Sequence, residues 1–94
     1  MDRTERYTAS PDVLAAHLEG EAVLLHMESK DYFRLNDTAA WVWKGLERGL
    51  DRPALVASLL ERYEVEPAAA EAELDRLLAD LEGRGLIRAE PAQE

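Results

Sequence analysis

The amino-acid sequence predicts an α+β fold, in which an N-terminal antiparallel sheet packs on one side of three helices. Two observations lead to this prediction. Short apolar or alternating segments, typical of strands, occur before residue 36, and segments with helical periodicity follow it. The chain has 94 residues, which is near the lower limit for a single hydrophobic core. We therefore expect one domain over residues 1–90 and a frayed tail at 91–94.

The first two segments that bear on the sheet are short. Residues 6–10, "RYTAS", could form an edge strand that is closed by a Ser-Pro step. Residues 12–20, "DVLAAHLEG", are ambiguous, because the segment is short and yet three of its residues fit one face of a helix, namely Val13, Leu14 and Leu18.

The central strands have clearer patterns. Residues 21–27, "EAVLLHM", form a continuous apolar run, which is typical of a strand covered on both faces. Residues 31–35, "DYFRL", alternate, so that Phe33 and Leu35 point to one face. The intervening "ESKD" turn lacks the glycine that tight hairpins prefer. We expect these segments to form an antiparallel meander.

Three helices are predicted after the meander. Asn36 or Asp37 can cap the first helix, which should stop near Gly49. Asp51 caps the second, whose apolar stripe consists of Leu55, Val56, Leu59, Leu60 and Tyr63. Pro67 opens the third, which should end at a glycine, Gly83 or Gly85. The apolar residues 86–88 then either lie on the body of the domain or add a short strand.

Composition argues against several functions. The formal net charge is −9, from 20 acidic and 11 basic residues, so the surface repels phosphate backbones and anionic lipid. No window approaches the roughly 20 consecutive apolar residues of a membrane span, and the N-terminus lacks the apolar core of a secretory signal. Cysteine is absent, which suits the cytoplasm. We expect a cytoplasmic protein without nucleic-acid or membrane partners, although acidic faces also simply keep a small domain soluble.

The sequence offers no group of residues suited to catalysis or metal binding. The two histidines, His17 and His26, match no metal-site spacing. The serines have no neighbouring base and no nucleophile-elbow motif, and the five glycines form no phosphate-binding loop. We therefore expect no enzyme, no metal and no cofactor, and we interpret the chain as a binding module.

Two modes of binding fit a meander followed by three helices. In a winged helix the third helix enters a DNA groove, but here that helix is acidic, which disfavours contact with phosphates. It carries Glu71, Glu73, Asp75, Asp80 and Glu82 against Arg76 and Arg84. Alternatively, an edge strand and a helix form a groove for an extended peptide, whose backbone pairs with the strand.

The order and spacing of several motifs resemble the PqqD-like family. The segment "VLLHMESKDYFRLNDTAAWVWKGLERG" is followed by "LLERYEV" and "LLADLEGRGLI", so the resemblance covers residues 21–88. The family often has glycine in the turn where this chain has "SKD". The matching positions are Val23, Leu24, Leu25, Tyr32, Leu35, Asn36, Thr38, Ala39, Trp43, Leu46, Tyr63, Val65, Leu78, Leu81, Gly85, Leu86 and Ile87.

The resemblance implies a winged helix-turn-helix-like domain, with a three-stranded antiparallel sheet packed on three helices. It also implies a recognition element (RRE) for ribosomally made, post-translationally modified peptides (RiPPs), which binds the leader segment of a precursor and delivers it to a modifying enzyme. The chain is most similar to the stand-alone, leader-binding half of the split lasso-peptide B protein, whose partner would be a cysteine-protease-like leader peptidase. Other pathways use discrete elements too, including a PqqD-type chaperone that serves a radical enzyme.

In the family the leader adds as a strand beside the third strand of the sheet and packs against the third helix. The candidate strand with a free backbone edge consists of Asp31, Tyr32, Phe33, Arg34 and Leu35, and the resemblance implies that Tyr32, Phe33 and Arg34 present main-chain partners to the leader. The alternative is an ordinary edge strand, protected by its charged residues. On the third helix, Leu78 and Leu81 are expected in the core, Leu74 and Leu77 are candidates for the groove floor, and the candidates for its rim are Glu73, Asp75 and Asp80.

The two tryptophans are two positions apart on a helix, so they cannot share one face. Trp43 matches the family tryptophan and is predicted to anchor the core, which leaves Trp41 nearer the surface, where it could contact the partner enzyme. Two further functions stay open: an acidic winged helix that acts in transcription through protein contacts, and a subunit that contributes residues to an enzyme's active site.

Overall fold

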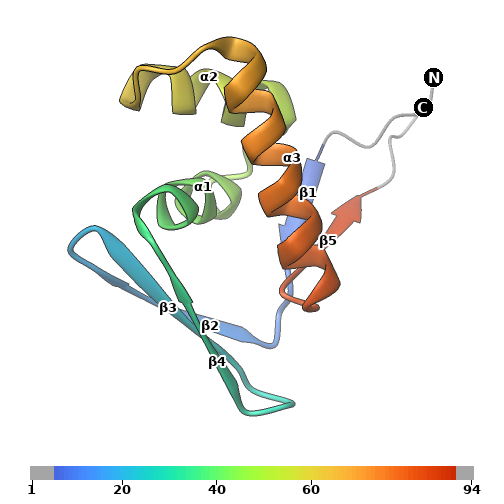
Figure 1. The fold of residues 1–94 in the computed structure, drawn as a ribbon. Helices are drawn as coiled ribbons and strands as arrows, with labels where there is room; N and C mark the ends of the chain where they lie inside the picture. The colour runs from blue at the N-terminus through green and yellow to red at the C-terminus, as the bar shows by residue number, and fades with distance from the viewer. Residues whose placement is uncertain (1–5, 91–94) are drawn as a thin grey trace.

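The computed structural model describes residues 6–90, which form five strands and three helices (Figure 1). In chain order the elements are β1 (Arg6–Ala9), β2 (Val13–Leu18), β3 (Glu21–His26), β4 (Asp31–Leu35), α1 (Asp37–Glu47), α2 (Arg52–Arg62), α3 (Pro67–Gly83) and β5 (Ile87–Glu90). The predicted α+β class and three-stranded antiparallel sheet are confirmed. The predicted tail at 91–94 lies outside the described residues.

The strands form two sheets. The larger sheet has the order β2-β3-β4, with both pairs antiparallel, and the helices lie on one side of it (Figure 1). The smaller sheet pairs β1 with β5. The "RYTAS" segment is thus a strand as predicted, but it is not part of the meander, and the apolar segment after α3 is a strand rather than a loop that lies on the body.

The ambiguous segment after Pro11 is strand β2, so its interpretation as a helical face is wrong. The residues that suggested a helix alternate between the two faces of the sheet, because side chains of a strand have a period of two. Val13 packs against the core, whereas Leu14 and Leu18 are each 56% exposed on the opposite face. Gly20 takes a φ of +74° in the turn to β3, a conformation that glycine adopts without steric cost.

The first two helix caps agree with the prediction. The Asn36 side chain accepts a hydrogen bond from Ala39 N at 2.9 Å at the start of α1. Asp51 accepts from Ala54 N at 3.1 Å at the start of α2. Each satisfies an N–H group that has no partner within the helix. The Asn36 cap also sets the direction in which the chain leaves β4, so it positions the strand relative to the helices.

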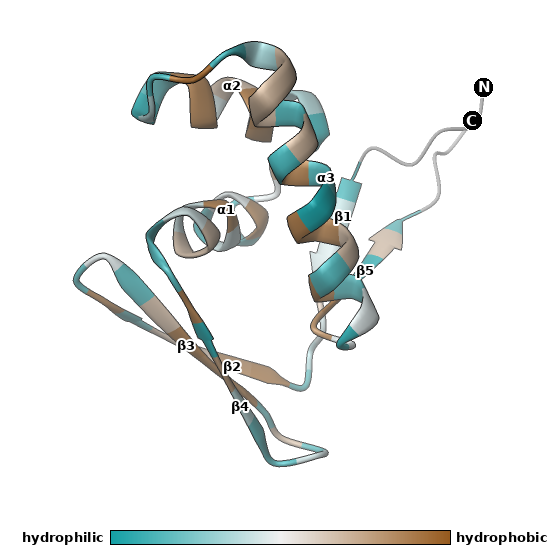
Figure 2. Cartoon of the chain, in the orientation of Figure 1, coloured by the Kyte–Doolittle hydropathy of each residue, from teal (hydrophilic) through white to brown (hydrophobic). Residues whose placement is uncertain are grey.

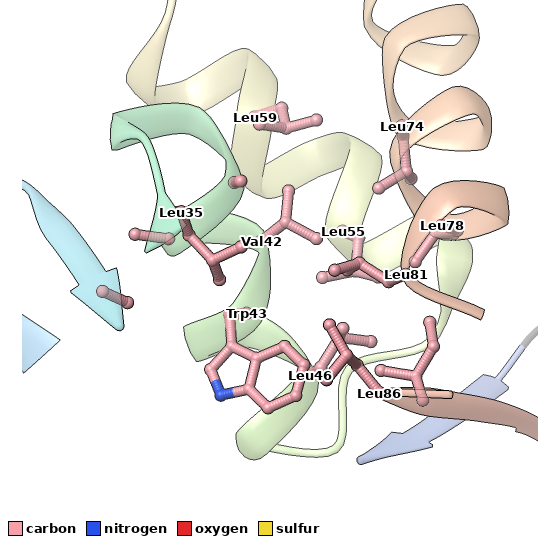
Figure 3. Packing of buried hydrophobic residues seen from close by; sticks show 14 of the residues in the cluster. Leu35, Val42, Trp43, Leu46, Leu55, Leu59, Leu74, Leu78, Leu81 and Leu86 are labelled. Atoms are coloured by element: carbon pink, nitrogen blue, oxygen red, sulfur yellow. The ribbon is translucent and has the colours of Figure 1, made fainter. Parts of the chain in front are cut away.

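The hydrophobic core fills the space between the helices and the inner face of the larger sheet (Figure 3). Trp43 is 1% exposed, which confirms its predicted role as the core anchor. Its Nε1 donates to Glu47 Oε2 at 3.0 Å, and the other oxygen of that carboxylate lies 3.0 Å from His17 Nε2. The carboxylate of Glu47, at the end of α1, therefore links that helix directly to His17 of strand β2 and also holds the indole of Trp43.

Trp41 is nearer the surface than Trp43, as expected, but its ring is already engaged. Its Nε1 donates to Ser58 Oγ at 2.8 Å, and the Arg62 guanidinium lies 4.4 Å from its ring centroid. The tryptophan thus joins α1 to α2, beneath a cation that is attracted to the face of the ring. This arrangement does not favour the predicted contact between Trp41 and a partner enzyme.

Helices α2 and α3 are joined by a two-pronged ion pair. Arg52 donates from Nε and from one terminal nitrogen to the two oxygens of Asp75, each at 2.9 Å. The hydrogen bond from Arg52 lowers the pKa of the Asp75 carboxyl below its ordinary value. Because the pKa of Asp75 is lower in the folded than in the unfolded protein, the ionised carboxyl stabilises the fold at pH values above the unfolded-state pKa. This stabilisation is lost as the pH falls through the folded-state pKa.

We expect the substitution Asp75→Asn to lower the free energy of unfolding at pH 7 by less than about 1 kcal/mol, because the pair is largely exposed. The difference between the parent and the variant should shrink as the pH falls below about 4, because the carboxyl is protonated there first in the unfolded protein and, at lower pH, in the folded protein. Urea unfolding at a series of pH values measures this difference. A difference that stays constant down to strongly acidic pH would contradict the assignment to the ion pair.

Candidate functional site

A groove of about 420 Å³ lies between strand β4 and helix α3. The strand forms one wall and the helix the other, and the segments that follow β4 and α3 complete the lining. The lining residues are Tyr32, Phe33, Arg34, Leu35, Asn36, Thr38, Ala39, Glu73, Arg76, Leu77, Asp80, Leu81, Arg84 and Leu86. Because β4 is the last strand of its sheet, one backbone edge of this strand faces the groove.

The pairing of the strands shows which peptide groups of β4 face the groove. Residue pairs of an antiparallel ladder alternate between pairs that exchange backbone hydrogen bonds and pairs that do not. Met27 N donates to Asp12 O at 2.8 Å, and these two residues continue the register of β2 and β3. Counting from this bonded pair, the N–H and C=O groups of Leu24 and His26 point toward β4.

The same alternation determines which residues of β4 form backbone hydrogen bonds with β3. Leu24 lies opposite Phe33, so Phe33 exchanges its backbone hydrogen bonds with β3. The intervening residues, Tyr32 and Arg34, therefore direct their N–H and C=O groups toward the open edge. A strand that added here would form its hydrogen bonds with Tyr32 and Arg34, and not with Phe33.

The side chains of β4 point alternately to the inner and the outer face of the sheet, whereas its backbone groups point along the plane of the sheet. Phe33 and Leu35 turn toward the helices, where Leu35 is 6% exposed and Phe33 packs against the core. Tyr32 points to the outer face of the sheet and is 72% exposed. The groove thus has an apolar inner surface next to a backbone edge that is open to pairing.

The helical wall comes from one stripe of α3 that continues to Arg84, the C-cap residue of this helix. Glu73, Leu77, Asp80 and Arg84 recur at intervals of three and four residues, the spacing that places side chains on one face of a helix. The neighbouring stripe turns inward, with Leu74, Leu78 and Leu81 at most 2% exposed (Figure 3). Leu77 is only partly buried, so it contributes most of the apolar surface that α3 offers to the groove.

Charged side chains of α3 pair with one another along the rim of the groove. Arg76 donates to Glu73 Oε2 at 2.6 Å, and Arg84 donates to Asp80 Oδ1 at 3.2 Å. The hydrogen bond to Glu73 raises the pKa of Arg76 above its ordinary value. The guanidinium of Arg84 also lies 5.5 Å from the ring centroid of Phe33, which brings a cation of the helix over the inner surface of the strand.

Most of the predicted site residues lie together in the groove, and three do not. Tyr32, Phe33, Arg34 and Leu35 lie on one wall, with Glu73, Leu77 and Asp80 on the other. Leu74 is 0% exposed in the core, so its side chain is not available to a ligand. Asp31 is exposed at the end of the turn but does not line the groove. Asp75, expected at the rim, instead faces α2 and binds Arg52.

The sequence analysis missed two arginines of the groove, Arg76 and Arg84. Both follow from the helical spacing that identified Glu73 and Asp80, because they lie three or four residues from these acids. The composition of the helix identifies them only as a minority of cations on an acidic surface. The groove therefore presents both signs of charge to a ligand, and not the uniformly acidic rim that the composition of α3 predicts.

A second, mostly apolar pocket of about 310 Å³ adjoins the groove near the starts of α1 and α3. It shares Thr38 and Glu73 with the groove and extends to Leu59, Tyr63, Val65, Ala69 and Ala70. Val65 is 46% exposed there. The open surface beside β4 thus continues into an apolar recess at the end of the strand from which α1 begins.

Within residues 6–90, no three His, Asp or Glu side chains come together in a way that could hold a metal ion. No helix of these residues is both long and apolar enough to cross a bilayer. Nδ1 of His26 is buried without a hydrogen-bond partner on the inner face of β3, away from the groove lining.

Comparisons with known proteins agree with the fold. Residues 21–87 match the family model described as coenzyme PQQ synthesis protein D (PqqD). The structure of TbiB1 in complex with the TbiA(beta) leader peptide is 30% identical in sequence, with a TM-score of 0.83 over 85% of this chain and 93% of that chain.

A lasso peptide synthetase B1 complexed with the leader peptide is 31% identical, with a TM-score of 0.79 over 86% of this chain and 95% of that chain. No curated protein matches the sequence. The family match covers strands β3 and β4, all three helices and the start of β5, and therefore includes every residue that lines the groove. The chain belongs to the PqqD family, as a PqqD-like RiPP recognition element.

Proposed function

We propose that the groove binds the leader segment of a ribosomally made precursor peptide as an additional antiparallel strand beside β4. The observation that carries this proposal is the open edge of β4, which faces α3 across a groove with an apolar inner surface. Main-chain hydrogen bonds to Tyr32 and Arg34 would provide affinity for any extended peptide. The side chains around Phe33 and Leu77 would then select among leader sequences.

Similarity to known complexes supports the same function. Both structures named above contain a leader peptide, and both cover more than four fifths of this chain. Since one of them is a lasso peptide synthetase subunit, we propose that this chain acts in lasso-peptide biosynthesis. Service to a radical enzyme is the second candidate, because the matching family model is described by coenzyme PQQ synthesis.

The proposed role of the protein is delivery and not catalysis. Binding of the leader orders a flexible peptide and leaves the rest of the precursor free. When the protein also contacts the modifying enzyme, such as a cysteine-protease-like leader peptidase, the precursor reaches a high effective concentration at that enzyme. The rate of modification at low precursor concentration would therefore depend on the affinity of the groove for the leader.

Fluorescence anisotropy of a labelled leader peptide tests the proposal. The peptide is taken from the precursor encoded beside this gene, and a scrambled peptide and a DNA duplex serve as controls. We expect saturable binding of the leader alone. In amide spectra, we expect the N–H groups of Tyr32 and Arg34 to shift more than that of Phe33. Failure to bind at tens of micromolar, or equal binding of the scrambled peptide, would contradict the proposal.

A further inference from the structure

The larger sheet has an apolar outer face that the helices leave uncovered. Cross-strand register places Leu14, Leu25 and Tyr32 in one row of this face and Ala16, Val23 and Arg34 in the next. Leu18, at the end of β2, lies at the margin of the face and also lines a small pocket with Trp41 of α1 and Arg62 of α2. Leu14 and Leu18 are each 56% exposed, and Tyr32 is 72% exposed. Figure 1 shows the helices on the opposite side, and Figure 2 shows hydrophobic stretches along β2 and β3.

The size of this face limits what can cover it. Three strands spaced by about 4.8 Å and five or six residues long make a face of about 14 Å by about 17 Å, or roughly 240 Å². Stable protein interfaces bury about 800 Å² per partner, so the face is too small to hold two copies of this chain together by itself. It is large enough to form the apolar centre of a transient interface whose rim is polar.

The outer face is continuous with the leader site, because Tyr32 and Arg34 belong to both. Their backbone groups point to the open edge of β4, and their side chains point to the outer face. A leader strand bound at that edge would extend the sheet by one strand. By the alternation of the pleat, every second leader side chain would then lie on the outer face, beside those of Tyr32 and Arg34.

We propose that this outer face, completed by the bound leader strand, is the docking surface for the enzyme that modifies the precursor. The inference rests on the proposed leader-binding function and identifies the partner surface of the same complex. An enzyme that docks there contacts protein and leader together, so it binds the loaded complex more tightly than the empty protein. By thermodynamic linkage, the enzyme strengthens leader binding by the same factor.

Charges around the face indicate the chemistry of the partner. Glu19 is exposed in the turn between β2 and β3, and Glu28 and Lys30 are exposed in the turn between β3 and β4. Arg34 is paired with Glu21 at 2.9 Å, so the positive charge of the guanidinium is largely compensated on this face. The complementary surface has an apolar centre and a basic group opposite Glu19, and such rim charges would mainly accelerate association.

The double variant Leu14→Thr/Leu18→Thr tests this proposal. Threonine keeps the strand propensity and removes apolar surface at two positions outside the groove, so the variant should fold and bind the leader with an affinity within about twofold of the parent. The rate of leader removal by the leader peptidase encoded with the precursor should fall at least about tenfold at limiting enzyme. The matched double variant Leu14→Met/Leu18→Met keeps the apolar surface and should retain the parent rate.

The possible results separate the two proposals. Intact leader binding with an unchanged rate of leader removal would overturn the docking proposal alone. A parent protein that binds no leader would overturn the proposed function, and the docking proposal with it. Sedimentation adds a third readout: a dimer of the parent that the threonine variant converts to a monomer would assign the face to a second copy and overturn enzyme docking. Stronger binding of the peptidase to the loaded than to the empty parent protein, lost in the threonine variant, is the supporting result.

Discussion

The substitution Arg34→Pro is expected to weaken leader binding by at least about tenfold while the domain stays folded. The N–H group of Arg34 points to the open edge of β4, so proline removes a donor that the added strand requires. Leaving the carbonyl of the leader without this donor costs about 1–3 kcal/mol. Proline is tolerated in edge strands at positions whose N–H does not join the sheet, so the fold should survive. Anisotropy of the labelled leader measures the loss.

Two further variants isolate the contribution of the backbone. Arg34→Ala removes the same ion pair with Glu21 but keeps the N–H, so it should bind the leader nearly as tightly as the parent. Phe33→Pro removes an N–H that pairs with β3, and it should instead destabilise the hairpin itself. Retained affinity in a folded Arg34→Pro protein would rule out strand addition at this residue.

Replacing Trp43 by alanine is expected to lower the free energy of unfolding by about 3–5 kcal/mol. The indole is 1% exposed at the centre of the core, and its removal leaves a large cavity. The change also breaks the hydrogen bond to Glu47, whose carboxylate contacts His17 of β2. Domains of this size are stabilised by only about 5–15 kcal/mol, so the variant would be close to unfolding.

Urea unfolding followed by circular dichroism measures this loss. Trp43→Phe keeps much of the buried area and should lose less stability than the alanine variant. Trp41→Ala is the matched control, because Trp41 is only partly buried and packs between α1 and α2. A Trp43→Ala protein that loses no more stability than Trp41→Ala would contradict the assignment of Trp43 as the core anchor.

The sequence was informative where one periodicity dominated. The α1 and α2 caps, the apolar stripes and the β3–β4 hairpin could be predicted, because each depends on residues that are close in sequence. Strand β2 could not, since Val13, Leu14 and Leu18 satisfy both a helical and a strand pattern in so short a segment. The pairing of β1 with β5 was also missed, because local patterns carry no information about which distant strand completes a sheet.

The candidate site shows the same limit. Helical spacing separates Leu77 from Leu78 and Leu81, but it does not tell which stripe faces the core, and therefore Leu74 could not be assigned before the packing was known. Which residues of β4 direct their N–H and C=O groups toward β3, and which toward the open edge, depends on the register between β4 and β3. If the register were shifted by one residue, the backbone groups of Phe33 and not those of Arg34 would point to the open edge.

The small sheet of β1 and β5 determines how the domain would respond to mechanical force. Thr8 and Glu90 are hydrogen-bonded although they lie 82 positions apart in sequence, and the antiparallel register places Arg6 opposite Glu90. Tension applied through the two ends of the chain would therefore unzip this ladder one residue pair at a time and would not shear all pairs at once. The smaller sheet would yield at low force, before the β2-β3-β4 sheet and the groove carry any load.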